Sequence, residues 1–214
     1  MDRDECRRSA RPTPILKGQC VTRGEFVRNL KNSEVKRWHP KDPDDPPRFG
    51  YRVKWPPTWR DAERSEGISV NARVCLSNLE CSIRLHPQAE QFCHVVTIDL
   101  ALLSERCGYQ VLAVYDPIDA PPDQANPCHF NLMPESEPLD DFLVALGDQL
   151  GVPCPKNLPK TTKEEETVRR ALSDYSAIFR VERNVVGSSW PNRDEGAATS
   201  RSDAPSTPPP SPAA

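Results

Sequence analysis

HVVTIDLALLSERCGYQVLAVY, which spans residues 94–115, carries the strongest secondary-structure signals in the chain. Its first five residues form a mostly apolar run, typical of a buried strand, and its last seven predict a second strand. Between them, Asp99 can cap a helix over 100–107, and Gly108 can end that helix in the left-handed conformation. Because a helix of two turns is short for a crossover between parallel neighbours, an antiparallel or mixed sheet is also allowed.

The C-terminal side of this stretch continues the alternation of strands and helices. Residues 128–133 alternate apolar and polar side chains, and 138–150 have the apolar stripe of an amphipathic helix. A capping-box pattern predicts another helix over 162–175, and 178–181 are expected to close the sheet as an edge strand. Gly, Ser, Ala and Pro dominate 187–214, so we expect this tail to be disordered.

The N-terminal side gives weaker signals. A capping-box pattern predicts a short helix over 23–32, and period-two alternation predicts a strand over 49–55. Short strands are expected over 68–74 and 76–85. A brief helix over 88–92 is favoured by the proline before it.

These elements predict an α+β fold, with a small mixed β-sheet covered by two or three short helices. Residues 66–183 are expected to form the single domain. The 24 prolines of the chain interrupt regular structure where they cluster. We therefore expect a flexible arm at 1–20, a basic, Pro- and aromatic-rich segment at 21–65, and the disordered tail at 187–214.

Charge is divided unevenly along the chain. Residues 1–60 hold 15 Lys and Arg against 8 Asp and Glu, a formal +7, and 61–214 hold 13 against 23, a formal −10; together they give −3. No cation lies between Cys107 and Pro155. Such asymmetry indicates a partner surface, a basic arm or an internal contact. An internal contact would involve the acidic connections at 116–123 and 135–141.

Basic and aromatic residues interleave in the segment 48–60. Phosphates attract cations and unstacked bases stack on aromatic rings, so this mixture is typical of single-stranded nucleic-acid binding. Asp42, Asp44 and Asp45 nearby would repel phosphate, so a Pro-rich flap with solvated cations is the alternative. The residues expected to bind nucleic acid or a partner are Arg48, Tyr51, Arg52, Lys54, Trp55, Trp59 and Arg60.

The eight cysteines are expected to be free and mostly buried, because none has the spacing of a zinc ribbon or redox motif. Two Cys-His dipeptides, Cys93-His94 and Cys128-His129, leave open a zinc site assembled across neighbouring strands. We expect neither a metal nor a cofactor. The N-terminus lacks the apolar region of a secretory signal and no apolar run could span a bilayer, so we expect a cytoplasmic protein without membrane contact.

His129 is the strongest candidate for chemistry, because it follows a loop rich in Pro and Asp. Asp116, Asp119 or Asp123 could orient its imidazole or hold a cation. Ser69-Val70-Asn71 adds a second polar point near a predicted strand, and His94 is a weaker catalytic candidate.

The functional prediction follows from the charge division and the missing catalytic motifs. We expect a non-catalytic interaction module that binds a partner protein, with single-stranded nucleic acid as an additional ligand. The alternative is a hydrolase or nuclease-like enzyme centred on His129, with Asp116 and Asp123 as supporting carboxylates. Whether the protein is an enzyme stays open at this point.

Overall fold

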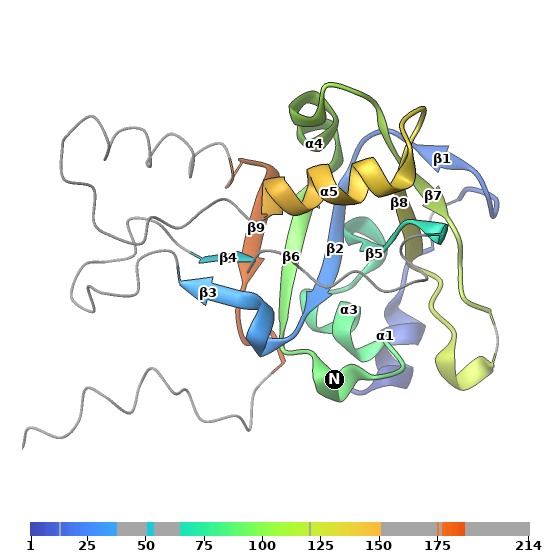
Figure 1. Cartoon of the computed structure of the whole chain (residues 1–214). Helices are drawn as coiled ribbons and strands as arrows, with labels where there is room; N and C mark the ends of the chain where they lie inside the picture. The colour runs from blue at the N-terminus through green and yellow to red at the C-terminus, as the bar shows by residue number, and fades with distance from the viewer. Residues whose placement is uncertain are drawn as a thin grey trace, which may run out of the picture.

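An antiparallel sheet organises the protein, as the computed structural model shows (Figure 1). The structure describes residues 1–12, 14–37, 51–53, 65–119, 121–150, 175 and 177–186. In spatial order the seven strands are β1 (Cys20–Val21), β7 (Val111–Tyr115), β8 (His129–Pro134), β5 (Ile68–Ala72), β2 (Glu25–Leu30), β6 (His94–Asp99) and β9 (Phe179–Glu182). Every described pair of neighbours is antiparallel, so the α+β class is confirmed and the mixed sheet is not found.

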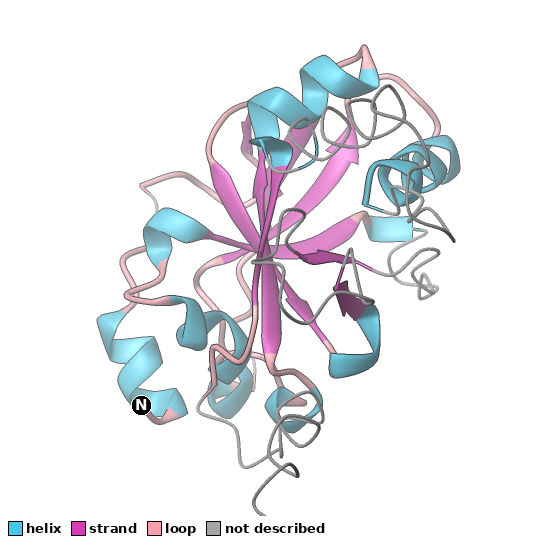
Figure 2. Ribbon diagram, turned by 90° about the vertical axis from the view of Figure 1, so that its left-hand side faces the viewer, coloured by secondary structure: helices cyan, strands magenta, loops and turns pink. Residues whose placement is uncertain are grey.

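The described helices lie towards both ends of the strands. They are α1 (Arg3–Ser9), α3 (Leu79–Arg84), α4 (Leu100–Cys107) and α5 (Leu139–Leu150), with short 3-10 turns η1 (Asn32–Glu34), η2 (Arg73–Cys75), η3 (Ala89–Gln91) and η4 (Pro122–Gln124). Figure 1 shows α4 and α5 towards one end of the strands and α1 and α3 towards the other. In Figure 2 the strands cross one another like a fan, which shows the strong twist of the sheet. A separate hairpin pairs β3 (Val35–Arg37) with β4 (Tyr51–Val53).

The stretch at 94–115 folds as its local signals predict. The Asp99 carboxylate accepts a hydrogen bond from the Leu102 N–H at 3.0 Å and caps α4, and Gly108 ends α4 with φ +77°. The flanking strands β6 and β7 are not neighbours, however, because β2, β5 and β8 lie between them. Local sequence signals define the two strands, whereas their partners come from distant parts of the chain.

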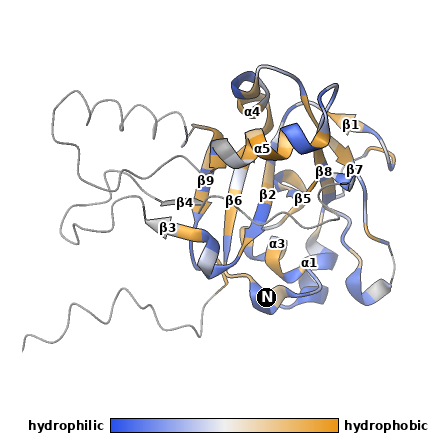
Figure 3. Cartoon of the chain, viewed as in Figure 1, coloured by the Kyte–Doolittle hydropathy of each residue, from blue (hydrophilic) through white to orange (hydrophobic). Residues whose placement is uncertain are grey.

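The two faces of the central strands differ in chemistry. Phe26, Phe130 and Tyr115 lie on one face, where the Phe26 and Phe130 rings pack edge to face with centroids 5.3 Å apart. Figure 3 shows hydrophobic residues in the strands and also in α3 and α5, whereas α1 is mostly hydrophilic. The opposite face of β5 and β8 carries polar side chains. The candidate site lies on this polar face of the two strands.

Two secondary-structure predictions are wrong for physical reasons. The segment expected as a helix over 23–32 forms β2, a central strand whose backbone is paired on both sides by β5 and β6. Phe26 and Val27 point to opposite faces and both are buried, so burial on two faces overrides the capping-box signal. The strand expected over 76–85 is instead the helix α3, because the Asn78 side chain caps it by accepting the Cys81 N–H at 3.0 Å.

The prediction of free cysteines is wrong for two pairs. Cys6 bonds to Cys81 and Cys75 bonds to Cys128, with Cα–Cα distances of 5.2 and 5.4 Å. Sequence spacing cannot reveal such pairs, because their members are 75 and 53 residues apart. Closing loops of this length stabilises a fold by about 4 kcal/mol each in the chain-entropy picture. The remaining described cysteines, Cys20, Cys93 and Cys107, are free, and Cys154 lies outside the described residues.

The remaining predictions concern the two terminal segments, the segment 21–65 and the helix over 162–175. The helix over 162–175, apart from one residue, and the tail at 187–214 lie outside the described residues. Within the expected arm at 1–20, α1 and β1 form, and β2 places part of the 21–65 segment at the centre of the sheet. Across the described ranges, we find no helix with the length and apolar character needed to cross a membrane.

Gly67 offers a direct test of the fold next to the polar face. It has φ +96°, and a Cβ built there would lie 2.5 Å from the Leu132 carbonyl oxygen of β8. Gly18 also has a positive φ, +84°, but its Cβ would meet nothing within 4 Å. We expect Gly18→Ala to cost about 1 kcal/mol of unfolding free energy from the backbone conformation alone. Gly67→Ala should cost roughly 3 kcal/mol or more, because it adds a clash with fixed backbone.

Urea unfolding followed by circular dichroism measures both values. Equal destabilisation by the two substitutions would contradict the close approach of β5 and β8 at this point.

Candidate functional site

Polar side chains gather where β5 and β8 pair. In the antiparallel register Ser69 lies opposite Asn131, and Asn71 lies opposite His129. Side chains two apart on a strand share a face, so these four residues share one face of the sheet. We call this group of four residues the polar face. Phe130 and Leu132 of β8 point the other way, into the apolar core.

Ser69 and His129 form the most specific contact on the polar face. Ser69 Oγ lies 2.9 Å from His129 Nε2, and His129 Nδ1 lies 2.6 Å from the main-chain carbonyl oxygen of Asp116. A carbonyl can only accept a hydrogen bond, so the proton of the neutral ring must be on Nδ1. Nε2 then carries the lone pair, and the Ser69 hydroxyl donates to it. This is the polarity that a base needs to activate a hydroxyl nucleophile.

Burial keeps the His129 imidazole neutral. The ring is 9% exposed, and its removal from water lowers its pKa below the usual value, although the Asp116 carbonyl opposes this shift. Ser69, its hydrogen-bond partner, is only partly buried. A neutral buried base next to the Ser69 hydroxyl is therefore present at neutral pH.

The loop that supplies the Asp116 carbonyl is held from several directions. The Asp116 carboxylate accepts a hydrogen bond from Asn131 at 3.2 Å and pairs with Lys17 at 3.0 Å. The hydrogen bond from Lys17 to this carboxylate raises the Lys17 pKa. At the other end of the loop, two backbone hydrogen bonds join Ile118 to Asn126, and the Asn126 amide donates to Asn71 at 2.8 Å. The position of Asp116 relative to His129 is thus fixed.

The predicted catalytic residues occupy different places. Asp116 is brought to His129, but its carbonyl rather than its carboxylate contacts the ring. The contact found for Asp123 is to Arg7, through the Asp123 carbonyl at 3.4 Å, and among described contacts none joins Asp123 to His129. The role of Ser69 as a partner of His129 was missed. The polar residues Ser69 and Asn71, which alternate with apolar ones in this strand, are the signal, but the register cannot be inferred from them.

Some of the basic residues near the N-terminus contact the acidic loop of the same chain. Lys17 binds Asp116, and Arg7 contacts the Asp123 carbonyl, so basic residues before position 20 dock on the acidic connection at 116–123. Of the basic and aromatic candidates, Tyr51 and Arg52 lie in β4. Those outside the described residues are Arg48, Lys54, Trp55, Trp59 and Arg60.

A zinc site across the Cys-His dipeptides is not formed. Strands β6 and β8, which begin at these dipeptides, are separated by β2 and β5, and Cys128 is held in a disulfide. Searching the described ranges for three or more clustered metal-ligating side chains finds none.

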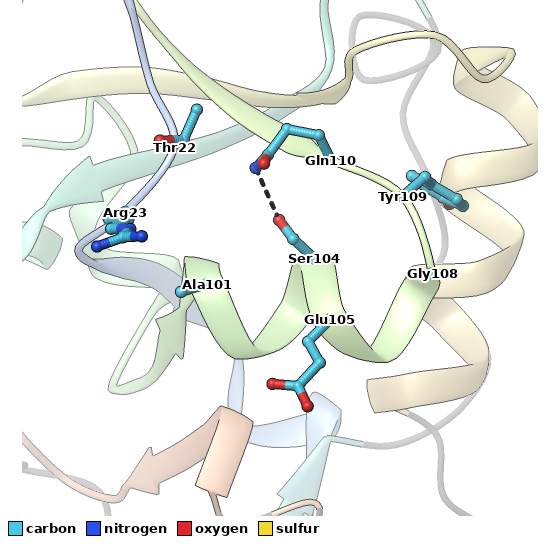
Figure 4. A pocket seen from close by; sticks show the side chains of 8 residues that line it. All are labelled: Thr22, Arg23, Ala101, Ser104, Glu105, Gly108, Tyr109 and Gln110. Carbon is cyan, nitrogen blue, oxygen red and sulfur yellow. Dashed lines mark hydrogen bonds between the residues drawn. The ribbon is translucent and has the colours of Figure 1, made fainter.

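Two hollows lie away from the polar face. One, of about 450 Å³, runs between α4 and the turn before β2. Figure 4 shows the Gln110 amide hydrogen-bonded to Ser104, which also accepts the Val111 N–H at 3.0 Å. These bonds tie the end of α4 to β7, so these groups have a structural role. The second hollow, of about 500 Å³, lies between α1 and the loop at 118–127.

Comparison of the chain with known proteins finds no matching family model, curated protein or solved structure. The chemistry of the site therefore rests on its geometry.

His94 is a structural histidine with a testable pH dependence. Its Nδ1 accepts the Asn184 N–H at 2.9 Å, so its Nε2 proton is donated to the Asn32 side chain at 3.0 Å. Burial, with Arg183 nearby, lowers its pKa to about 4. A folded-state pKa below the unfolded value means that the unfolded state binds protons more readily. The stability from neutral His94 is therefore present above about pH 6.5 and is lost as pH falls towards 4.

We expect the wild type to lose roughly 2 kcal/mol more unfolding free energy than His94→Gln between pH 7 and pH 4.5. Glutamine keeps a donor and an acceptor but does not titrate. Urea unfolding of both proteins at the two pH values measures the difference, and identical pH dependence would show that His94 is not held neutral.

Proposed function

We propose that the protein is a hydrolase that uses Ser69 as nucleophile and His129 as general base. The observation that carries this proposal is the chain of hydrogen bonds from Ser69 Oγ to His129 Nε2 and from His129 Nδ1 to the Asp116 carbonyl. It develops the enzyme hypothesis centred on His129 and replaces the supporting carboxylate with a main-chain carbonyl. Asp123 is not part of this arrangement.

The reaction follows from the protonation states. As Ser69 Oγ attacks an acyl carbon, its proton passes to His129 Nε2, and the imidazolium then gives that proton to the leaving group. Water, deprotonated by His129, then attacks the acyl carbon, and the imidazolium returns that proton to Ser69 Oγ as the acid is released. The Asp116 carbonyl orients the ring and stabilises the imidazolium through the Nδ1 proton. A neutral carbonyl stabilises this charge less than a carboxylate, so we propose esters with good leaving groups as substrates rather than amides.

An active-site-directed fluorophosphonate and a p-nitrophenyl ester test this chemistry. We expect the probe to attach to Ser69 in the wild type. Ser69→Ala should abolish labelling, and His129→Gln should slow both labelling and ester hydrolysis about a thousandfold or more, because each removes one partner of the proton transfer. Ser77→Ala is the matched control: its hydroxyl pairs with Ser9 on the surface, and it should behave like the wild type.

Peptide mapping by mass spectrometry locates the label, and circular dichroism verifies folding of each variant. The hydrolase proposal would be contradicted if the folded wild type is not labelled by the probe at Ser69 and hydrolyses the ester no faster than Ser69→Ala.

The interaction module remains a second proposal, and the hairpin of β3 and β4 favours it. Its register sets Lys36 opposite Arg52 and Arg37 opposite Tyr51. Three of these four residues are basic, a composition that favours an anionic partner. Together with Tyr51, this arrangement supports a partner protein or single-stranded nucleic acid as the ligand.

Fluorescence anisotropy with single-stranded RNA and DNA tests this second proposal. We expect binding at low salt that weakens steeply as salt rises. Arg52→Glu should reduce the affinity at least tenfold, whereas Arg106→Glu in α4 carries the same charge change and should have little effect. An equal loss of affinity in both variants would indicate that binding depends on the net charge of the protein rather than on the hairpin. Absence of binding at low salt would remove nucleic acid from the proposal.

A further inference from the structure

The helix α1 is joined to the helix α3 by a covalent bond. Of its seven residues, Cys6 alone is buried, at 1% exposed, and Cys6 forms the disulfide to Cys81 of α3. Figure 3 shows α1 as mostly hydrophilic, in agreement with the sequence RDECRRS. Burial of apolar surface therefore contributes little to its docking.

The hydrogen bonds from α1 to neighbouring elements are part-buried or exposed. Arg3 donates to the Leu85 carbonyl at 3.1 Å, and the Ser9 and Ser77 hydroxyls lie 3.0 Å apart. Hydrogen bonds of this kind add only a modest net stability, because water competes for them. A helix of seven residues is also far too short to be stable in isolation. Without the disulfide, these contacts would have to hold both the fold and the position of α1.

The same helix covers the loop that precedes β8. The hollow between them is lined from α1 by Asp4, Arg7 and Arg8, and from the loop by Ile118, Asp119, Ala125 and Pro127. Arg7 crosses the hollow to the Asp123 carbonyl. Just after α1, the Arg11 N–H donates to the Cys75 carbonyl at 2.9 Å, so the chain is held there independently of the Cys6–Cys81 disulfide.

The two disulfides differ in how they are shielded. Met1, which is 39% exposed, covers Cys81 with its sulfur 3.5 Å from Cys81 Sγ. All four bonded cysteines are buried, but Cys75 and Cys128 join η2, which follows β5, to the residue before β8. A reductant can reach Cys6–Cys81 after α1 opens locally, whereas Cys75–Cys128 requires the sheet to open. Local opening of a short peripheral helix is the less costly of the two.

We propose that α1 is a redox-controlled latch: reduction of Cys6–Cys81 releases α1 from α3 and from the loop at 118–127, while Cys75–Cys128 stays intact. A dithiol supplies the two electrons. Its thiolate attacks one cystine sulfur, the other leaves as a thiolate that takes up a proton, and the second thiol of the reductant resolves the mixed disulfide. The products are two protein thiols and the cyclic disulfide of the reductant.

Limited trypsin digestion after Arg7 and Arg8, followed by mass spectrometry, measures the release of α1. We expect Cys6→Ser to be cleaved at these bonds at least tenfold faster than the wild type without reductant. Cys20→Ser, which changes an exposed free cysteine, is the matched control and should match the wild type. Cleavage of Cys6→Ser at the wild-type rate would overturn the latch.

A second measurement uses the wild type alone, so it does not depend on folding of a variant. The protein is treated with increasing dithiothreitol, alkylated with iodoacetamide and mapped. We expect Cys6 and Cys81 to be alkylated at lower dithiothreitol than Cys75 and Cys128, with trypsin sensitivity at Arg7 and Arg8 rising in parallel. Reduction of Cys75–Cys128 first, or reduction of Cys6–Cys81 without faster cleavage, would contradict the proposal.

Discussion

The antiparallel pairing of β5 with β8 is the constraint on which the rest of the structure depends. Its register sets Ser69 opposite Asn131 and Asn71 opposite His129, so four polar side chains share one face while Phe130 and Leu132 enter the core. A slip of one residue would place the polar groups in the core and the apolar groups outside. The Cys75–Cys128 disulfide lies just beyond Asn71 and His129 and ties the ends of these strands together.

Elements defined by short-range signals could be predicted from the sequence. The strand β6, the Asp99-capped helix α4, the strand β8 and the amphipathic helix α5 all form close to their expected positions. The strand β2 could not be predicted, because Phe26 and Val27 are buried on opposite faces and only the neighbouring strands reveal this. The disulfides and the strand order depend on contacts between distant residues, which spacing along the chain does not encode.

The candidate site could be predicted in part for the same reason. The loop composition indicates His129 and Asp116 as candidates. The contact between them uses a main-chain carbonyl, however, and every residue has one, so the residue types cannot predict this contact. Ser69 was visible as a polar residue near a strand, yet its meeting with His129 follows from the β5–β8 register. The basic N-terminal arm and the acidic loop also contact each other within the fold. Lys17 pairs with the Asp116 carboxylate, and Arg7 donates to the Asp123 carbonyl.

The tautomer of His129 tests the account most directly, because the proposed chemistry requires a neutral ring with its proton on Nδ1. Long-range ¹H–¹⁵N NMR of the imidazole at pH 7 distinguishes the two neutral tautomers and the imidazolium. The account predicts a protonated Nδ1 and an unprotonated Nε2, with the Nε2 resonance shifting in Ser69→Ala as its hydrogen bond is lost. A proton on Nε2 at pH 7, or an Nε2 resonance unchanged in a folded Ser69→Ala variant, would contradict it.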